Sequence, residues 1–274
     1  MTAAMEFAWQ EEVPDAENFG PGSVVLSAFP SAGLATIIAG HYMVRALKLP
    51  RIGRFESPDL APVAVVQGGE VHPTVRAYGR RDLALVLSEF PPSPAQANAI
   101  ARTILATAAR RRARAIICLE GVVPHPEGET EAADATEGGD ETGAEQIWVT
   151  YARRDPAFAA PFAAARARIL EEGVIGGVSG ALLVQGIGGA VPVAALLVSA
   201  RIAEGLPDHR AGAALIETLD RLLPELQIDT LPLRAQAEQI EKALRAVIKS
   251  QRAGPPEPGG TGPESGPPSP EMYG

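Results

Sequence analysis

The chain has 274 residues, 46% of them hydrophobic, which is enough apolar material for a core in one large domain or two small ones. Its net charge of −9 argues against a nucleic-acid-binding protein, because phosphate contacts require a basic surface. Cys118 is the single cysteine and excludes an internal disulfide. Together with an acidic N-terminus that lacks an apolar signal core, it favours a reducing, cytoplasmic location.

The first half of the chain predicts strands that alternate with helices. Short apolar and β-branched runs indicate buried strands, and apolar residues at helical spacing indicate the helices between them. Such alternation predicts a single layered α/β domain with a mainly parallel sheet flanked by helices. The expected elements are strands at 23–29, 61–67, 74–79, 82–90 and 115–121, and helices at 34–49 and 95–112.

An acidic segment at 126–145 interrupts this pattern. It contains eight acidic residues between Glu127 and Glu145 and no basic one, so we expect a flexible, solvated insertion. The acids lack the alternating positions and the fixed glycine of a calcium loop, and no metal site is predicted.

The second half continues with a strand at 147–152 and an alanine-rich helix at 155–172. The next segment, 174–200, has no charged residue and is long enough to span a membrane. Its glycines and Pro192 favour a buried strand, a tight turn and a packed helix, so no membrane partner is expected. Helices at 209–223 and 234–251 close the body.

An enzyme is the alternative interpretation, as an α/β hydrolase or a nucleotide-binding protein. Ser179 lies in a G-x-S-x-A sequence that lacks the last glycine of a nucleophile elbow, and the context of the histidines suggests no partner for it. The glycines of this region lack phosphate-loop spacing, and Cys118 has the apolar flanks of a core residue. The histidines considered as partners for Ser179 are His41, His72, His125 and His209, and the glycines that lack phosphate-loop spacing are Gly186, Gly188 and Gly189. No catalytic, cofactor-binding or metal-ligating residue is predicted.

The only basic run is Arg110–Arg112 with Arg114. Cations near the end of a helix complement its dipole, which is the first interpretation. An acidic protein surface is the second possible role, and nucleic acid is the third.

The last 22 residues, 253–274, include seven prolines and six glycines and have too little apolar surface to fold. We expect a disordered arm. It ends in Met272-Tyr273-Gly274, an apolar residue, a tyrosine and a carboxylate that a partner's pocket could hold. This ending resembles the HbYX motif with which proteasome activators and assembly factors dock between α subunits of the proteasome core particle. The resemblance makes Met272 the hydrophobic position, Tyr273 the penultimate tyrosine and Gly274 the carboxylate.

Three further stretches resemble the archaeal-type proteasome assembly chaperones. They are the strand, turn and helix that begin at Val24, the glycine-rich stretch 173–183, expected to lead into a strand, and the two helices between Asp208 and Leu244. The resemblance spans residues 20–250. It implies an α/β domain at 1–252 without known catalysis, a homo-oligomer, and binding to α subunits of the proteasome core particle. The acidic insertion departs from the family pattern.

Overall fold

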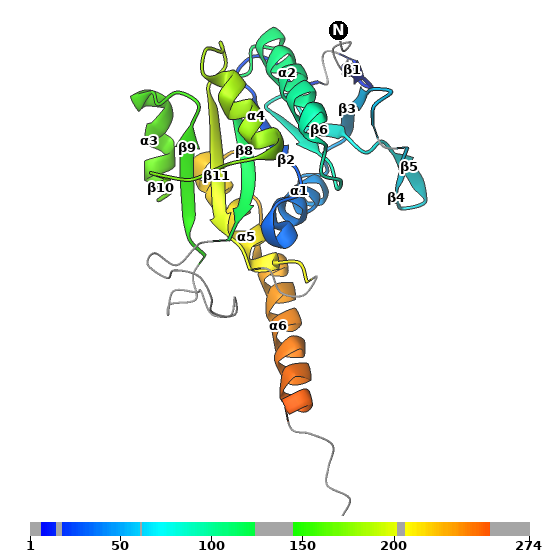
Figure 1. Cartoon of the computed structure of the whole chain (residues 1–274), viewed down its shortest axis with the longest axis vertical. Helices are drawn as coiled ribbons and strands as arrows, with labels where there is room; N and C mark the ends of the chain where they lie inside the picture. The colour runs from blue at the N-terminus through cyan, green and yellow to red at the C-terminus, as the bar shows by residue number, and fades with distance from the viewer. Residues whose placement is uncertain (1–6, 15–17, 61, 124–144, 202–205, 253–274) are drawn as a thin grey trace, which may run out of the picture. The chain divides into compact units, whose positions relative to one another are not determined.

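The computed structural model describes residues 7–14, 18–60, 62–123, 145–201 and 206–252 (Figure 1). It divides the chain into two compact units, residues 1–237 and residues 238–274. The second unit is described only over its helical part, 238–252. The expected arm at 253–274 and all but the last residue of the acidic insertion lie outside the described residues.

The first unit is a layered α/β domain, as the alternating sequence pattern predicts. Its strands are β1 (Ala8–Glu11), β2 (Val24–Ala28), β3 (Arg51–Glu56), β4 (Val65–Gln67), β5 (Glu70–His72), β6 (Arg76–Arg80), β7 (Leu83–Leu87), β8 (Ala115–Val122), β9 (Ile147–Tyr151), β10 (Arg168–Ile169) and β11 (Val193–Ser199). The helices are a short 3-10 turn (Ala32–Leu34), α1 (Ala35–Ala46), α2 (Pro94–Arg110), α3 (Pro156–Ala164), α4 (Gly177–Gly186), α5 (His209–Leu222) and α6 (Leu231–Arg252), which continues into the second unit.

Nine of these strands form one mixed sheet in the order β1-β3-β6-β7-β2-β8-β11-β9-β10. The four central strands, β7, β2, β8 and β11, run parallel. On one side β6, β3 and β1 follow in antiparallel pairing. On the other side β9 pairs antiparallel to β11, and the edge strand β10 pairs parallel to β9. β2 and β7 are buried at every position, as expected of parallel strands covered on both faces. β4 and β5 form a separate two-stranded hairpin.

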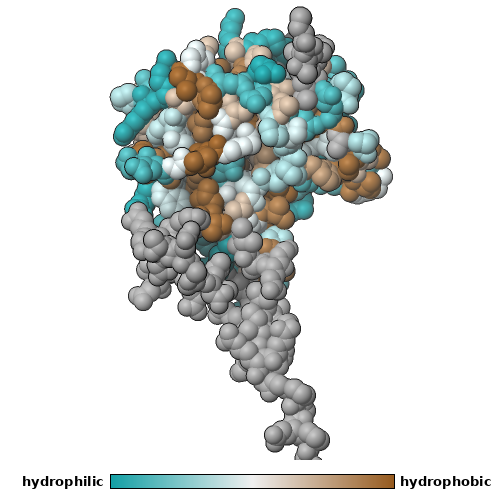
Figure 2. All heavy atoms as spheres, in the orientation of Figure 1, coloured by the Kyte–Doolittle hydropathy of each residue, from teal (hydrophilic) through white to brown (hydrophobic). Residues whose placement is uncertain are grey.

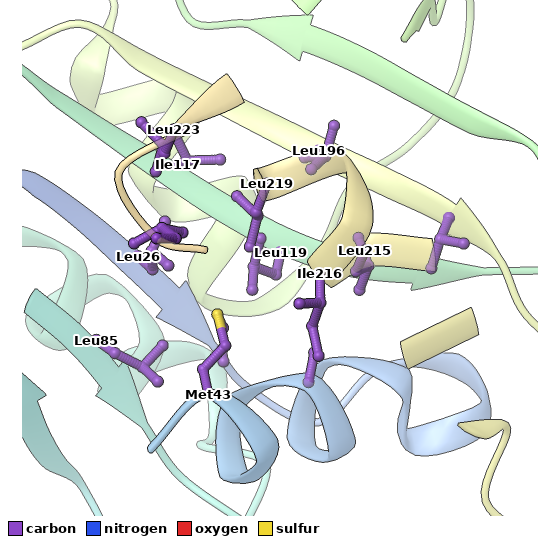
Figure 3. Close-up of a cluster of buried hydrophobic side chains, with 14 of the residues drawn as sticks. Leu26, Met43, Leu85, Ile117, Leu119, Leu196, Leu215, Ile216, Leu219 and Leu223 are labelled. Carbon is purple, nitrogen blue, oxygen red and sulfur yellow. The ribbon is translucent and has the colours of Figure 1, made fainter. Parts of the chain in front are cut away.

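Each face of the sheet supports its own hydrophobic core. On one face the strands pack against α1 and α5, and Figure 3 shows Met43 of α1 and Leu215, Leu219 and Leu223 from α5 and its end grouped with strand residues such as Leu119. On the other face they pack against α2 and α4, and the side chains there include Ile104. Alternation along β8 divides its residues between the two cores.

The glycine-rich stretch 173–183 was expected to lead into a strand, and this expectation is wrong. It leads into α4, and the strand of the charge-free segment, β11, comes after the helix. Gly176 caps α4, and a Cβ atom at Gly180 would clash with the carbonyl oxygen of Ile175, so a glycine there allows the chain to turn tightly into the helix. In the described part of the chain, no helix is long and apolar enough to cross a membrane.

The expected helix at 155–172 is also shorter than its composition predicts. α3 ends at Ala164, Arg166 adopts a positive φ of 65°, and Arg168–Ile169 forms the edge strand β10. Alanine content favours helix, but pairing with β9 determines the structure of these last residues.

A buried cation connects the antiparallel part of the sheet to α1. Arg76 of β6 is fully buried and donates to both carboxylate oxygens of Glu89, at 2.8 and 2.5 Å. His41 of α1 contacts the same carboxylate, with Nε2 2.9 Å from Oε1. Burial alone would raise the pKa of Glu89, but the hydrogen bonds from Arg76 and His41 lower it to about 2.

We predict that Glu89→Ala lowers the free energy of unfolding by about 3 kcal/mol at pH 7, because it leaves the buried Arg76 guanidinium without its partner. Urea denaturation measures the change. Glu56→Ala is the control, since its partner Arg54 is partly exposed and the expected loss is below about 1 kcal/mol. Equal losses for the two variants would contradict a structural role for the Arg76–Glu89 pair.

Candidate functional site

The residues predicted to dock, Met272, Tyr273 and Gly274, lie outside the described residues, so their role stays a prediction. The structure does describe α6, the last helix before these residues in the sequence. We therefore examine first the contacts that hold the start of α6 within the first unit.

The start of α6 is held by buried side chains and by ion pairs. Leu233 and Ala237 are buried in the first unit. Arg234 donates from Nε and Nη2 to the two carboxylate oxygens of Glu217 on α5, at 2.5 and 2.6 Å. These bonds lower the pKa of Glu217 below its usual range. The Tyr42 hydroxyl donates to the carbonyl oxygen of Asp229 at 2.6 Å, so α1 also holds the approach to α6.

The last residue of the acidic insertion takes part in the same network. Glu145 accepts from Arg210 of α5 at 3.0 Å, and Arg234 lies 3.9 Å from its second oxygen. Glu145 and the first turn of α6 are therefore both held by α5.

Ser179, the candidate nucleophile, lies in the first turn of α4 and is 2% exposed. Its hydroxyl lies beside the Glu120 carboxyl and the Cys118 thiol, both on β8. Burial raises the pKa of the Cys118 thiol far above its ordinary range and raises the pKa of Glu120 to about 7. The cluster thus contains a partly buried carboxyl with a raised pKa beside a fully buried thiol.

This geometry gives no support to a hydrolase. A serine nucleophile requires an adjacent base and access for substrate. Ser179 is buried, and the three described histidines interact elsewhere. His41 contacts Glu89, His72 contacts Arg51 and His209 contacts the carbonyl oxygen of Pro207.

The candidate phosphate-binding glycines occupy the wrong end of a helix. Gly186 ends α4, and Gly188 and Gly189 precede β11, whereas a phosphate loop precedes a helix N-terminus. A Cβ atom at Gly186 would lie 2.6 Å from Cγ2 of Val193, so this glycine allows close packing of α4 on the sheet. Among the described residues, no group of three or more His, Cys, Asp or Glu side chains could hold a metal ion.

The basic run has acidic partners within the fold. Arg110 and Arg111 pair with Glu11 of β1, at 3.0 and 2.6 Å, and Arg114 pairs with Glu225 at 2.9 Å. These arginines connect the end of α2 to neighbouring segments, so they give no support to a nucleic-acid site.

Polar groups at the carboxyl edge of the central strands bind one another. The Ser31 hydroxyl accepts from the backbone N–H of Gly121 at 2.9 Å and lies 3.1 Å from the Thr36 hydroxyl, which donates to the carbonyl oxygen of Phe29. A Cβ atom at Gly121 would clash with the carbonyl oxygen of Ala32. This edge, where α/β enzymes often bind ligands, is here closed by the turn after β2.

Two exposed apolar surfaces remain without a role in the core. The α4 patch consists of Val174, Val184 and Ile187, which are 99%, 69% and 57% exposed. The hairpin patch consists of Val63, Val66 and Val71, and the last two are 66% and 67% exposed. In Figure 2 brown surface covers the region of α4 and, separately, the projecting hairpin β4–β5. Neither surface was predicted from the sequence, although the charge-free α4 segment carried the signal for one of them.

Comparisons with known proteins agree with this fold. The family model described as the PAC2 family matches residues 25–248. A protein of Methanocaldococcus jannaschii described as uncharacterised is 27% identical over 226 residues, which cover 82% of this chain and 85% of that protein.

Two Pyrococcus furiosus structures have the same fold. PbaA, described as an archaeal homologue of proteasome-assembly chaperone, has a TM-score of 0.73 at 22% identity, covering 90% of this chain and 94% of its own. PbaB, described as an archaeal proteasome activator, has a TM-score of 0.70 at 19% identity, covering 89% and 99%.

The fold defines the protein as a layered α/β domain with a mixed sheet covered by helices on both faces. Because the family model matches most of its length, the chain belongs to the PAC2 family.

The Glu120 cluster gives a prediction with a defined sign. Between the ordinary value of 4.5 and a pKa of about 7, the folded protein holds a proton that the unfolded chain has released. The free energy of unfolding therefore falls as pH rises through this window, by up to about 3 kcal/mol. Glu120→Gln is neutral at every pH, so we expect it to raise the melting temperature at pH 8 and to leave it nearly unchanged at pH 5.

Calorimetry of both proteins across this range measures the effect. Glu172→Gln, a change at an exposed carboxyl, is the control and should not alter the melting temperature at either pH. A Glu120→Gln variant that is less stable than the wild type at pH 8 would show that Glu120 is ionised and well solvated in the folded protein.

Proposed function

We propose that this protein is a non-enzymatic proteasome assembly chaperone or core-binding adaptor. Its C-terminal segment docks Met272, Tyr273 and Gly274 into pockets between α subunits of the proteasome core particle. The observation that carries the proposal is a Met-Tyr-Gly ending after a Pro/Gly-rich segment, on a chain whose body belongs to the PAC2 family.

The body supports this role through the start of α6. Ion pairs and buried contacts hold residues 226–237 in the first unit, so the segment that leads to the docking residues leaves the body from a fixed point. The 22 residues after α6 would span about 25 Å as a flexible coil, which is enough to join a body to a nearby pocket.

The protein acts in the cytoplasm. It forms a homo-oligomer, so that each particle carries several C-terminal hooks. A single three-residue hook binds weakly, but several hooks on one homo-oligomer raise the effective concentration and strengthen binding by about 10²–10⁴. The names of PbaA and PbaB, an assembly-chaperone homologue and a proteasome activator, support a proteasome-related role without a catalytic one.

We predict that Tyr273→Ala, or deletion of residues 272–274, abolishes binding to proteasome core particles and leaves the melting temperature unchanged. Loss of a buried tyrosine anchor costs about 2 kcal/mol, roughly thirtyfold for each hook, and the loss multiplies across an oligomer. Light-scattering titration with core particles from the same source measures binding.

Two controls accompany this experiment. Glu271→Gln changes the adjacent residue but keeps the motif, and it should bind like the wild type. One residue added after Gly274 should weaken binding, because it displaces the carboxylate. If the truncated protein bound as tightly as the intact one, the docking role of the last three residues would be refuted.

A further inference from the structure

Cations collect at the amino edge of the sheet, where the central parallel strands begin. Arg80 and Arg81 form the turn between β6 and β7, and Arg112 and Arg114 lie between α2 and β8. Lys48 follows α1 and precedes β3, which pairs with β6. These five residues are called the basic edge. They extend along the sheet from β6 to β8, which are three strands apart, about 14 Å.

Backbone hydrogen bonds fix the positions of two of these cations. The carbonyl oxygens of Arg81 and Arg112 accept from the N–H groups of Gly20 and Gly22, at 3.0 and 2.9 Å. The two arginines therefore flank one short loop, and both side chains are exposed to solvent, as is that of Lys48.

The described acidic residues along this edge are engaged within the fold. Asp82 pairs with Arg80 at 2.8 Å, and Glu225 pairs with Arg114 at 2.9 Å. Three further acids accept from arginines at the end of α2 or from backbone N–H groups, and they are Glu11, Asp155 and Asp220.

The other three cations of the basic edge have no such partner. Lys48, Arg81 and Arg112 make no ion pair with any residue that the structure describes. The exposed Glu171 and Glu172 follow β10, which lies three strands beyond β8, about 14 Å farther along the sheet. That separation exceeds the Debye length at physiological salt, so these two acids do not neutralise the basic edge.

We infer that the basic edge binds an acidic segment of a partner protein. An extended chain of about five residues spans 14 Å, so a short run of aspartate or glutamate can reach the cations from β6 to β8. The whole chain has a net charge of −9. A long polyanion such as nucleic acid would run beyond the basic edge and meet repulsion there, whereas a short acidic segment ends within it.

This surface goes beyond the proposed docking of the C-terminal segment and does not depend on it. Arg234, in the first turn of α6, lies near Glu145, which precedes β9. The first residues of β9 pair with the last residues of β11, so the start of α6 is at the opposite, carboxyl edge of the central strands. An acidic partner on the basic edge therefore leaves the start of α6 uncovered, and one copy can hold two different proteins.

Glycine substitutions remove two of the charges without disturbing the fold. Lys48 and Arg112 have positive φ values of 50° and 55°, just after the end of a helix, where glycine is preferred. Lys48→Gly with Arg112→Gly should therefore leave the melting temperature unchanged or raise it.

Arg166 provides the matched control. It follows α3 with a φ of 65° and precedes β10, in which Arg168 pairs with Trp148 near the start of β9. Arg166→Gly thus removes the same kind of charge, from the same kind of helix end, at the opposite edge of the sheet.

Fluorescence anisotropy of a labelled peptide of about ten glutamates, titrated with the full chain at low ionic strength, measures binding. The wild type should bind this peptide but not a glutamine peptide of the same length, and salt should weaken the binding. Lys48→Gly with Arg112→Gly should bind about tenfold more weakly, because two cations that face the ligand are lost. Arg166→Gly and the chain without residues 272–274 should bind like the wild type.

Several results would overturn the inference. They are a wild type that does not bind the glutamate peptide, an equal loss for Arg166→Gly, and tighter binding of a uridine oligonucleotide of the same length, which would assign the edge to nucleic acid. If the glycine variant melts at a lower temperature, Arg81→Gln replaces it, and unchanged binding by that variant would equally contradict the inference. Titration with core particles is a separate measurement, so the docking of residues 272–274 and the binding of an acidic segment can fail independently.

Discussion

Burial of the four central parallel strands on both faces is the constraint on which the rest of the molecule depends. β2 and β7 expose no residue on either side, so helices must cover both faces, and the sheet divides the core into two clusters. On one face this brings α1 and α5 together, and these two helices then supply the contacts that fix the start of α6 through Tyr42 and Glu217. On the other face it places α4 over β8, where the Ser179 hydroxyl meets Glu120. The support for the start of α6 and the partly buried position of Glu120 both follow from the requirement that helices cover both faces of the sheet.

The sequence predicted the central fold well because its signals there are strong and local. Runs such as those of β2, β7, β8 and β11 have the continuous apolar composition of strands buried on both faces, and the α/β class was evident from their alternation with helices. The short strands β1, β3 and β5 were not predicted from the sequence. Their few residues mix charged and apolar side chains, and they form strands because they pair with a neighbouring strand. The stretch before α4 was misassigned because its glycines indicate a break but do not distinguish a helix from a strand after it.

The candidate site was less predictable than the fold. The Met-Tyr-Gly ending is evident in the sequence alone, and family membership agrees with the resemblance seen in three separate stretches. The partners of Arg76, Glu145 and Arg234 could not have been foreseen, because each pair joins segments that are separated in the chain. Sequence patterns offered no reason to expect reactive groups at Ser179 and Cys118, and both are buried in the structure. The neighbouring acid, Glu120, had no sequence signal beyond a single carboxyl at the end of an apolar run.

The β4–β5 hairpin also has a consequence for the lifetime of the free chain. It belongs to no larger sheet, and on the body side its described side-chain contacts are the Gln67–His41 and Arg51–His72 hydrogen bonds. Two-stranded hairpins are marginal in water, so this element should open locally at a small fraction of the global unfolding free energy. The free chain would therefore expose an extended, protease-sensitive segment near Gly68. A partner that covered the hairpin would protect this segment from proteolysis.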